Sequence, residues 1–415
     1  MVYNIGSDGG NSTIKQKLST GMRIIYPSVL VPKTLHYNKY KGNGKPTRDK
    51  LDVEITIDRL NRNEVSRVIF GEGAKEYVNA ASGNRANMDK SNDDDLVKAQ
   101  LIATAYSIFL DNYRKGKNLC EKKGARHSFR VNIGTALPYE ESVREGAIDK
   151  YREKLMGNHL IKFKNPDFNE LTMELVVENA LTHYVEGEVV LDLLLEKINE
   201  DPNELLGSIF AVADGGAYTF DVTGAEFEKD FDEDLLAGTR EEFIQAVTKD
   251  QFSFGIERGI GHVFQEIIED VEAENTDILK RYLDRKDIED ALEVKLEGKK
   301  GWIMPERIYV GDKINERTSV YARQVAKKFI SHYNNANAMS KVKRIYLTGG
   351  ASKIDAFVDT FVDVLKEEGY DPDIIIRLSN EPDPIYANAE GCLVALEQDL
   401  EEIKMSEAGE LRENA

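Results

Sequence analysis

Three glycine-rich turns, each entered from a short apolar strand, restrict most strongly what this chain can fold into. They read Asp8-Gly9-Gly10-Asn11-Ser12-Thr13, Asp214-Gly215-Gly216-Ala217-Tyr218-Thr219 and Thr348-Gly349-Gly350-Ala351-Ser352. The first two share an aspartate at the strand end and a threonine five residues later. Because glycine has no Cβ, the backbone of such a turn can approach an anion and direct its N–H groups toward it. The repeated design favours phosphate binding.

One Gly-Gly turn alone is weak evidence, because a β-hairpin with a glycine corner gives the same pattern. Three such turns, two of them with aspartate, favour a nucleotide site. The sequence has no G-x-x-x-x-G-K-[ST] and no G-x-G-x-x-G after a strand, so those two phosphate-binding schemes are disfavoured. An aspartate repels phosphate, but it can hold a hydrated Mg²⁺ that neutralises both partners. We therefore expect Asp8 and Asp214 to organise Mg²⁺, with their loops on opposite sides of one triphosphate.

Strand-like and helical segments alternate along the whole chain, which indicates an α/β architecture. The expected strands include 2–5, 51–57, 129–133, 173–177, 209–213, 219–222, 344–347 and 374–376. The expected helices are 94–115, 179–198, 257–271, 278–296, 315–333, 354–368 and 383–403. In this pattern Glu178 ends a strand, and Asn179 caps the helix that follows.

Composition excludes several classes of protein. The 415 residues include 55 Lys+Arg against 74 Asp+Glu, a net charge of −19, which gives no electrostatic footprint for broad nucleic-acid binding. Cys120 and Cys392 are too few for a disulfide framework or a Cys-based zinc site. No apolar run approaches the ~20 residues that cross a bilayer, and the start does not resemble a secretory signal. We therefore expect a cytoplasmic protein that binds neither nucleic acid nor membrane directly.

The three turns resemble the nucleotide-binding motifs of the actin-like ATPases. Residues 8–15 resemble the first phosphate loop, 214–221 the second phosphate loop, and 345–352 the adenosine motif. Their order and spacing fit the fold shared by actin, the heat-shock chaperone ATPases and hexokinase, over nearly the whole chain. Within that group, the compact start and the segment 132–138 look most like the ParM-type plasmid-segregation actins of bacteria.

The resemblance implies an α/β, actin-like (ribonuclease H-like) two-domain ATPase fold with the nucleotide in the interdomain cleft. Residues 1–178 would form domain I and residues 179–385 domain II. Residues 386–415 would form a C-terminal helix returning to domain I, followed by an acidic tail.

The resemblance also implies roles for individual residues. The phosphate-binding residues would be Gly9, Gly10, Asn11, Ser12, Thr13, Gly215, Gly216, Ala217 and Thr219. Lys15 would reach a phosphate as a point charge, the alternative being a solvated strand lysine. Glu257 and Arg258 would contact the ribose or adenine, the alternative being a surface salt-bridge pair. The adenosine would be bound by the third turn, through Gly349, Gly350 and Ala351.

The catalytic residues implied by the resemblance are Glu178, Asp214 and Asp8. Glu178 would orient the attacking water, because the catalytic glutamate of ParM-type proteins also stands where a strand gives way to a helix. Glu174 is the second candidate. The alternative is that Glu178 is an ordinary carboxylate in the first turn of a helix.

The expected function is a filament-forming, Mg-ATP-dependent ATPase that drives plasmid DNA segregation. Its partners would be other copies of the chain and a DNA-bound adaptor protein. The sequence does not distinguish ATP from GTP. The alternatives are a small-molecule kinase of the same superfamily, a chaperone-type ATPase, and another bacterial cytoskeletal actin. A kinase would need a catalytic aspartate in domain I, and a chaperone-type ATPase would need a further substrate-binding domain.

Overall fold

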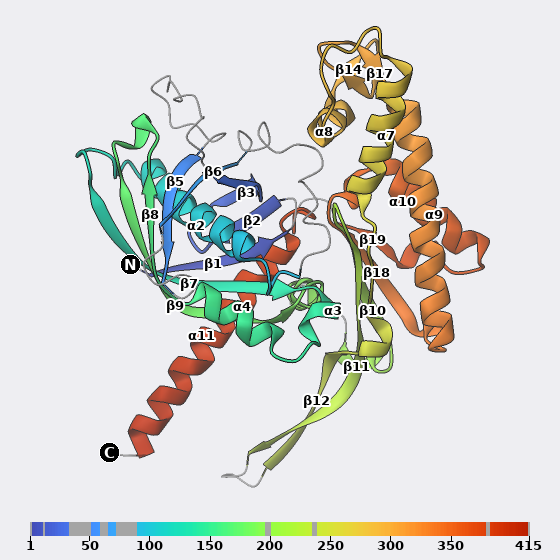
Figure 1. The fold of residues 1–415 in the computed structure, drawn as a ribbon. Helices are drawn as coiled ribbons and strands as arrows, with labels where there is room; N and C mark the ends of the chain where they lie inside the picture. Colours follow the sequence, from blue (N-terminus) through green and yellow to red (C-terminus); the bar gives the residue numbers. More distant parts are fainter. Residues whose placement is uncertain are drawn as a thin grey trace. The chain divides into compact units, whose positions relative to one another are not determined.

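The computed structural model describes residues 2–10, 13–32, 51–58, 65–71, 89–195, 201–234, 239–378 and 382–413 (Figure 1). The chain divides into two compact units. Unit 1 comprises Met1–Glu196 with Tyr386–Ala415, and unit 2 comprises Lys197–Ile385. Each unit is built around one main sheet with helices packed on it.

Unit 1 has a sheet with the strand order β3-β2-β1-β7-β9-β8-β5-β6-β4. Its strands are β1 (Val2–Gly9), β2 (Thr13–Leu18), β3 (Arg23–Pro27), β4 (Leu30–Pro32), β5 (Leu51–Ile57), β6 (Ser66–Phe70), β7 (Arg126–Leu137), β8 (Gly157–Phe163) and β9 (Thr172–Val185). Its helices are α2 (Asp94–Arg114), α3 (Tyr139–Ser142), α4 (Ala147–Leu155), α5 (Glu188–Leu195) and α11 (Ala387–Glu413).

Unit 2 has a sheet with the strand order β12-β11-β10-β18-β19. Its strands are β10 (Ile209–Gly215), β11 (Phe220–Asp234), β12 (Thr239–Thr248), β13 (Phe254–Ile256), β18 (Val342–Thr348) and β19 (Ile375–Arg377). Two short hairpins lie outside this sheet: β14 (Lys295–Leu296) pairs with β15 (Lys299–Lys300), and β16 (Trp302–Ile303) pairs with β17 (Ile308–Tyr309). Its helices are α6 (Pro202–Leu205), α7 (Ile260–Glu274), α8 (Arg285–Glu293), α9 (Gly311–Asn335) and α10 (Asp355–Glu367).

The two sheets share a run of five strands with one order. In unit 1 the run β3-β2-β1-β7-β9 places the first strand in the middle, antiparallel to the second strand and parallel to the next one. In unit 2 the run β12-β11-β10-β18-β19 repeats this arrangement. The turn that follows the central strand is therefore the corner of an antiparallel hairpin in both units.

Helices α2 and α11 sandwich the central strands of unit 1 (Figure 1). Helix α2 is buried along most of its length, and Asp93 caps its first turn by accepting a hydrogen bond from the N–H of Leu96. Helix α11 approaches the strands so closely that a Cβ at Gly6 or Gly134 would overlap a carbonyl oxygen of the helix. The C-terminal helix thus belongs to the core of unit 1.

Strand β9 contradicts one sequence-based expectation. It runs from Thr172 to Val185, so the prediction of a strand end at Glu178 and a helix over 179–198 is wrong. Asn179, expected to be a helix cap, instead donates to the Oδ1 of Asn132 (2.9 Å), and Asn132 donates to the Oδ1 of Asn4 (2.9 Å). This amide ladder satisfies polar side chains inside the sheet. Because β9 remains in its sheet, the units divide after Glu196 and not at residue 178.

The other helices follow the sequence more closely. Helices α2, α9 and α10 confirm the expectations for 94–115, 315–333 and 354–368 within a few residues at each end. The helix expected over 278–296 is shorter, since α8 spans only Arg285–Glu293. The hairpin partner expected over 219–222 is longer, because β11 continues to Asp234.

Candidate functional site

The first glycine-rich turn is the corner of the β1–β2 hairpin. Asp8 pairs with Lys15 across the two strands, and Gly9 pairs with Ile14. The carboxylate of Asp8 is 5% exposed, and its Oδ2 lies 2.8 Å from the Nζ of Lys15. Asn11 and Ser12, predicted to bind phosphate, lie outside the described residues.

The second turn has the same construction in unit 2. Asp214 pairs with Asp221 and Gly215 with Phe220, in the register of the first hairpin. A Cβ added at Gly216 would lie 3.2 Å from the carbonyl oxygen of Thr219, three residues on. In the first turn, a Cβ at Gly10 would similarly lie 2.8 Å from the carbonyl oxygen of Thr13. A side chain at Gly10 would force the backbone to shift, and one at Gly216 would make an unusually tight contact with it.

The third turn lies beside the second. Strand β18 runs parallel to β10 and pairs Thr348 with Asp214. Gly349 has a positive φ of 76°, and a Cβ there would overlap the Oδ1 of Asp214 and lie 2.7 Å from the carbonyl oxygen of Gly215. Gly350 is exposed, and Ala351 is buried against Gly215. The structure therefore brings together the second and third turns, two of the three that the sequence singled out.

The N-terminus of helix α7 fixes the shape of the second turn. The N–H of Ile260 donates to the carbonyl oxygen of Gly216 (3.0 Å), and that of Gly261 donates to Ala217 (2.8 Å). Beside this corner, the guanidinium of Arg285 lies over the ring of Tyr218, 4.3 Å from its centroid. Arg285 was not singled out from the sequence, because no local pattern relates it to a turn some sixty-seven residues earlier.

Glu257 and Arg258 lie just before helix α7. Glu257 is exposed. The guanidinium of Arg258 forms an ion pair with Glu266 (2.7 Å), and its carbonyl oxygen accepts a hydrogen bond from the hydroxyl of Tyr321 (2.7 Å). The ion pair of Arg258 is therefore with Glu266 and not with Glu257, and a role of the two residues in nucleoside binding stays a prediction.

A buried charged cluster surrounds Asp8 in unit 1. The Nζ of Lys90, a residue only 5% exposed, lies 3.8 Å from the Oδ1 of Asp8 and forms an ion pair with Glu186. The carboxylate of Glu141 accepts hydrogen bonds from the backbone N–H groups of Lys90 (2.9 Å) and Ser91 (2.6 Å). The lysine is thus held by its backbone and paired through its side chain.

Opposite charges in the cluster favour the charged forms of Asp8 and Lys90. Burial by itself would lower the pKa of Lys90, but Glu186 and then Asp8 raise it above its usual value. Burial would likewise raise the pKa of Asp8, but Lys15 and Lys90 together lower it. At neutral pH the cluster therefore carries a charged Asp8 carboxylate between two ammonium groups.

Glu186 and Glu178 occupy different levels of the sheet. Tyr184 pairs with Ala136 of β7, and the neighbouring Thr135 pairs with Ser7 of β1, so the end of β9 is level with Asp8. Glu186 follows directly after that end. Glu186 was not named from the sequence, although it follows a largely apolar run and precedes a glycine and then a helix.

Glu178 lies in the middle of β9, ion-paired with the exposed Arg130. Its neighbours Val177 and Asn179 are level with residues 3 and 4 of β1. Asp8 is four to five residues farther along that strand, about 15 Å at ~3.3 Å per residue. Glu174, the second candidate, lies still farther back and contacts Arg126 (3.3 Å). Among the described residues, Glu186 is the glutamate that Lys90 links to Asp8.

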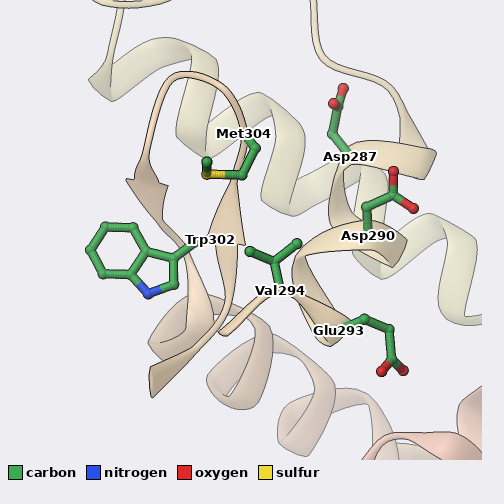
Figure 2. Close-up of a pocket in the computed structure, with 6 residues that line it drawn as sticks. All are labelled: Asp287, Asp290, Glu293, Val294, Trp302 and Met304. Carbon is green, nitrogen blue, oxygen red and sulfur yellow. The ribbon is translucent and has the colours of Figure 1, made fainter. Parts of the chain in front are cut away.

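A small hollow of about 260 Å³ lies far from these turns in sequence, on α8 and the β16 hairpin (Figure 2). It is lined by Asp287, Asp290, Glu293, Val294, Trp302 and Met304. Figure 2 shows the three carboxylates spread along the helix without converging on one point. Asp287 is also engaged by Arg281 (2.7 Å). In the described ranges no group of three or more His, Cys, Asp or Glu could hold a metal ion.

The described helices include none that combines the length and the apolar character of a membrane span. No protein-family model matches the chain, and no curated protein matches it. Solved structures do. The actin-like protein Alp7A is similar at a TM-score of 0.68 and 17% identity, over 98% of this chain and 100% of that one.

Two further solved structures are similar to the chain. A 15-stranded ParM filament from Clostridium botulinum matches at a TM-score of 0.62 and 17% identity, over 95% of this chain and 99% of that one. The archaeal actin homologue Ta0583, in complex with ADP, matches at a TM-score of 0.61 and 16% identity, over 95% and 99%. These similarities show that the chain has the actin-like fold.

Proposed function

We propose that this actin-like chain is a Mg-ATP-dependent ATPase that assembles into filaments and moves plasmid DNA in the cytoplasm through a DNA-bound adaptor protein. The observation that carries the proposal is the duplicated hairpin, with an aspartate and two glycines at the same register of the five-strand run that the two sheets share. The ADP bound to one structure of this fold and the filament formed by another support it.

The residues of the two hairpins fit a magnesium-bound polyphosphate. Gly10 and Gly216 stand at corners where a side chain would meet backbone, so the turn N–H groups can approach an anion. Asp8 and Asp214 supply the carboxylates that Mg²⁺ prefers, usually through water. A bound Mg²⁺ would supply charge neutralisation for the phosphates. Lys15, which already contacts Asp8, would bind the phosphates as a point charge.

The hydrolytic carboxylate in this proposal is Glu186, in place of Glu178. Glu186 lies between the end of strand β9 and the start of helix α5. This is the kind of position that was expected for the catalytic glutamate. Lys90 holds it beside Asp8. A carboxylate fixed in this way can orient a water molecule and accept its proton, the role that general bases fill in enzymes.

Assembly with nucleotide tests the proposal against its alternatives. We expect Mg-ATP to raise the light scattering of the purified chain above a threshold concentration, and electron microscopy to show filaments. A kinase of the same fold would bind Mg-ATP and give no threshold. Failure to bind either ATP or GTP with Mg²⁺ in calorimetry would overturn the nucleotide site itself. Sedimentation of the filaments with candidate DNA-binding proteins then tests the adaptor.

A further inference from the structure

A two-stranded arm extends the sheet of unit 2. Strand β11 pairs with β10 only from Phe220 to Glu226, and Phe227 still exchanges backbone hydrogen bonds with Gly207 and Ser208. Beyond Phe227 the strand pairs only with β12, from Glu228 against Gln245 to Asp234 against Thr239. These residue pairs span about 23 Å at ~3.3 Å per residue. Figure 1 shows this ribbon leaving the rest of its sheet.

Such an arm is poorly stabilised by its own contacts. An isolated two-stranded ribbon is marginally stable in water, and both of its edges present unpaired backbone groups in the described structure. The paired segments 228–234 and 239–245 contain seven Asp and Glu against two Lys and Arg, a net charge of −5. A positively charged partner would offset this excess of negative charge.

The described part of this acidic chain carries a compact positive segment in unit 1. Residues 114–130, between the end of α2 and the first part of β7, contain seven Lys and Arg against one Glu. All seven basic residues are exposed. Arg114, Lys117 and Lys122 form no ion pair with any residue that the structure describes. We call residues 114–130 the basic segment.

The arm and the basic segment both lie away from the glycine-rich turns of their own unit. The arm begins beyond Glu226, which pairs with Ile209 at the start of β10, whereas Asp214 is at that strand's end. The basic segment reaches Arg130, which pairs with Val2 at the start of β1, whereas Asp8 is near that strand's end. A contact between them would leave both turns accessible to nucleotide.

We propose that the β11–β12 arm of one copy docks on the basic segment of the next copy, so that the two surfaces form a head-to-tail contact of the assembled protein. The inference rests on the proposed function and names the surface through which subunits join. A contact between two different surfaces of identical chains repeats indefinitely unless the rotation closes it into a ring. The second copy is the favoured occupant, because the same chain supplies both an acidic arm and its positive complement.

Paired charge reversals test this contact. Variant A carries Asp232→Lys, Glu233→Lys and Asp234→Lys in the arm, and variant B carries Arg114→Glu, Lys117→Glu and Lys122→Glu in the basic segment. Each alone sets like charges against each other, and we expect its threshold concentration for assembly with Mg-ATP to rise at least about tenfold. Mixed in equal amounts, A and B present opposite charges at both contacts, so we expect the mixture to assemble near the wild-type threshold.

Three readouts keep the result unambiguous. The control variant with Lys280→Glu, Lys299→Glu and Lys300→Glu changes the net charge as variant B does, at exposed positions elsewhere, and should assemble like wild type. Calorimetry should show unchanged Mg-ATP binding by A and B, which reports that they fold. Wild-type assembly should weaken with added salt, since screening reduces contacts between exposed charges.

The outcomes separate the contact from the function. If wild type assembles and variants A and B assemble equally well, or the mixture fails to recover, the proposed contact is wrong and the filament function stands. If wild type binds Mg-ATP and never assembles, the proposed function fails and the contact fails with it.

Discussion

Lys90 and Glu186 form a buried ion pair beside Asp8, at the end of unit 1's central strand where the first glycine-rich hairpin begins. The pair joins the segment before α2 to the end of β9. It places the Glu186 carboxylate and the Lys90 ammonium group next to a predicted phosphate loop. Breaking a buried pair by removing one partner costs several kcal/mol in general, so every variant below needs a stability measurement.

Glu186→Gln should abolish most ATP hydrolysis. An amide cannot accept a proton from water, and losing a general base typically costs about 10²–10⁴-fold in rate. We expect kcat to fall by that amount, with Mg-ATP binding by calorimetry within a few-fold of wild type and a thermal melt still cooperative. Glu178→Gln is the matched control and should retain hydrolysis. Loss of hydrolysis in the Glu178 variant alone would restore the sequence-based assignment.

Asp8→Asn and Asp214→Asn should each weaken nucleotide binding chiefly when Mg²⁺ is present. We expect at least about tenfold loss of ATP affinity with Mg²⁺, equivalent to about 1.4 kcal/mol, and a smaller change in EDTA. Asp359→Asn, on the exposed surface of α10, is the control and should bind normally. Equal losses with and without Mg²⁺ would argue that the two carboxylates shape the hairpins without organising a metal.

Gly349→Ala should disturb the second and third turns more than its backbone angle alone explains. Gly349 and Gly369 both have a positive φ, of 76° and 84°, so alanine costs roughly 1–2 kcal/mol at either position. Only at Gly349 would the new Cβ overlap Asp214, whereas Gly369 has nothing within 4 Å. We expect Gly349→Ala to lose ATP binding and Gly369→Ala to keep it, as measured by calorimetry. Equal binding by the two variants would show that Asp214 moves aside freely.

His262 should make the protein less stable in mild acid. Burial, and then the charges of Arg285 and Arg258, lower the pKa of His262 below its usual 6.5, while its Nδ1 accepts a hydrogen bond from the N–H of Gly259 (3.2 Å). The unfolded chain therefore binds this proton more readily than the folded chain. The contribution of neutral His262 to the free energy of unfolding is fully present above about pH 6.5. This contribution is lost as the pH falls from that value toward the lower pKa of the folded chain.

The measurement is the thermal midpoint between pH 8 and pH 5. We expect the midpoint of wild type to fall more steeply below pH 6.5 than that of His262→Asn. The variant should keep part of the slope, because the pKa of His332 is lowered as well. An NMR titration in which His262 gains its proton at or above pH 6.5 would contradict the expectation.

Local features of the fold could be predicted from sequence because each is set by neighbours in the chain. The apolar run before Asp214, the two glycines after it and the threonine that follows specify a hairpin corner with few other solutions. Helix α2 is equally local, with Asp93 as its cap and apolar positions at helical spacing. The structure confirms both.

The end of β9 could not be predicted in this way. Glu178 and Asn179 interrupt an apolar run, which is typical of a strand end followed by a helix cap. Their polar groups are satisfied instead by Arg130 and Asn132 on the neighbouring strand β7. A sequence pattern does not show partners some forty-seven residues away, so the strand appeared eight residues too short and Glu186 was overlooked.

The sequence by itself determined that two aspartate-and-glycine hairpins and a third glycine turn exist, because short-range sterics and strand pattern are sufficient for that. Only the tertiary structure decided which distant charges join them. Lys90 contacts both Asp8 and Glu186, which are far apart in the sequence. Gly349 lies against Asp214 because β18 and β10 are parallel neighbours linked by a long crossover. Strand register depends on packing of the whole sheet, and that is a property of the folded unit.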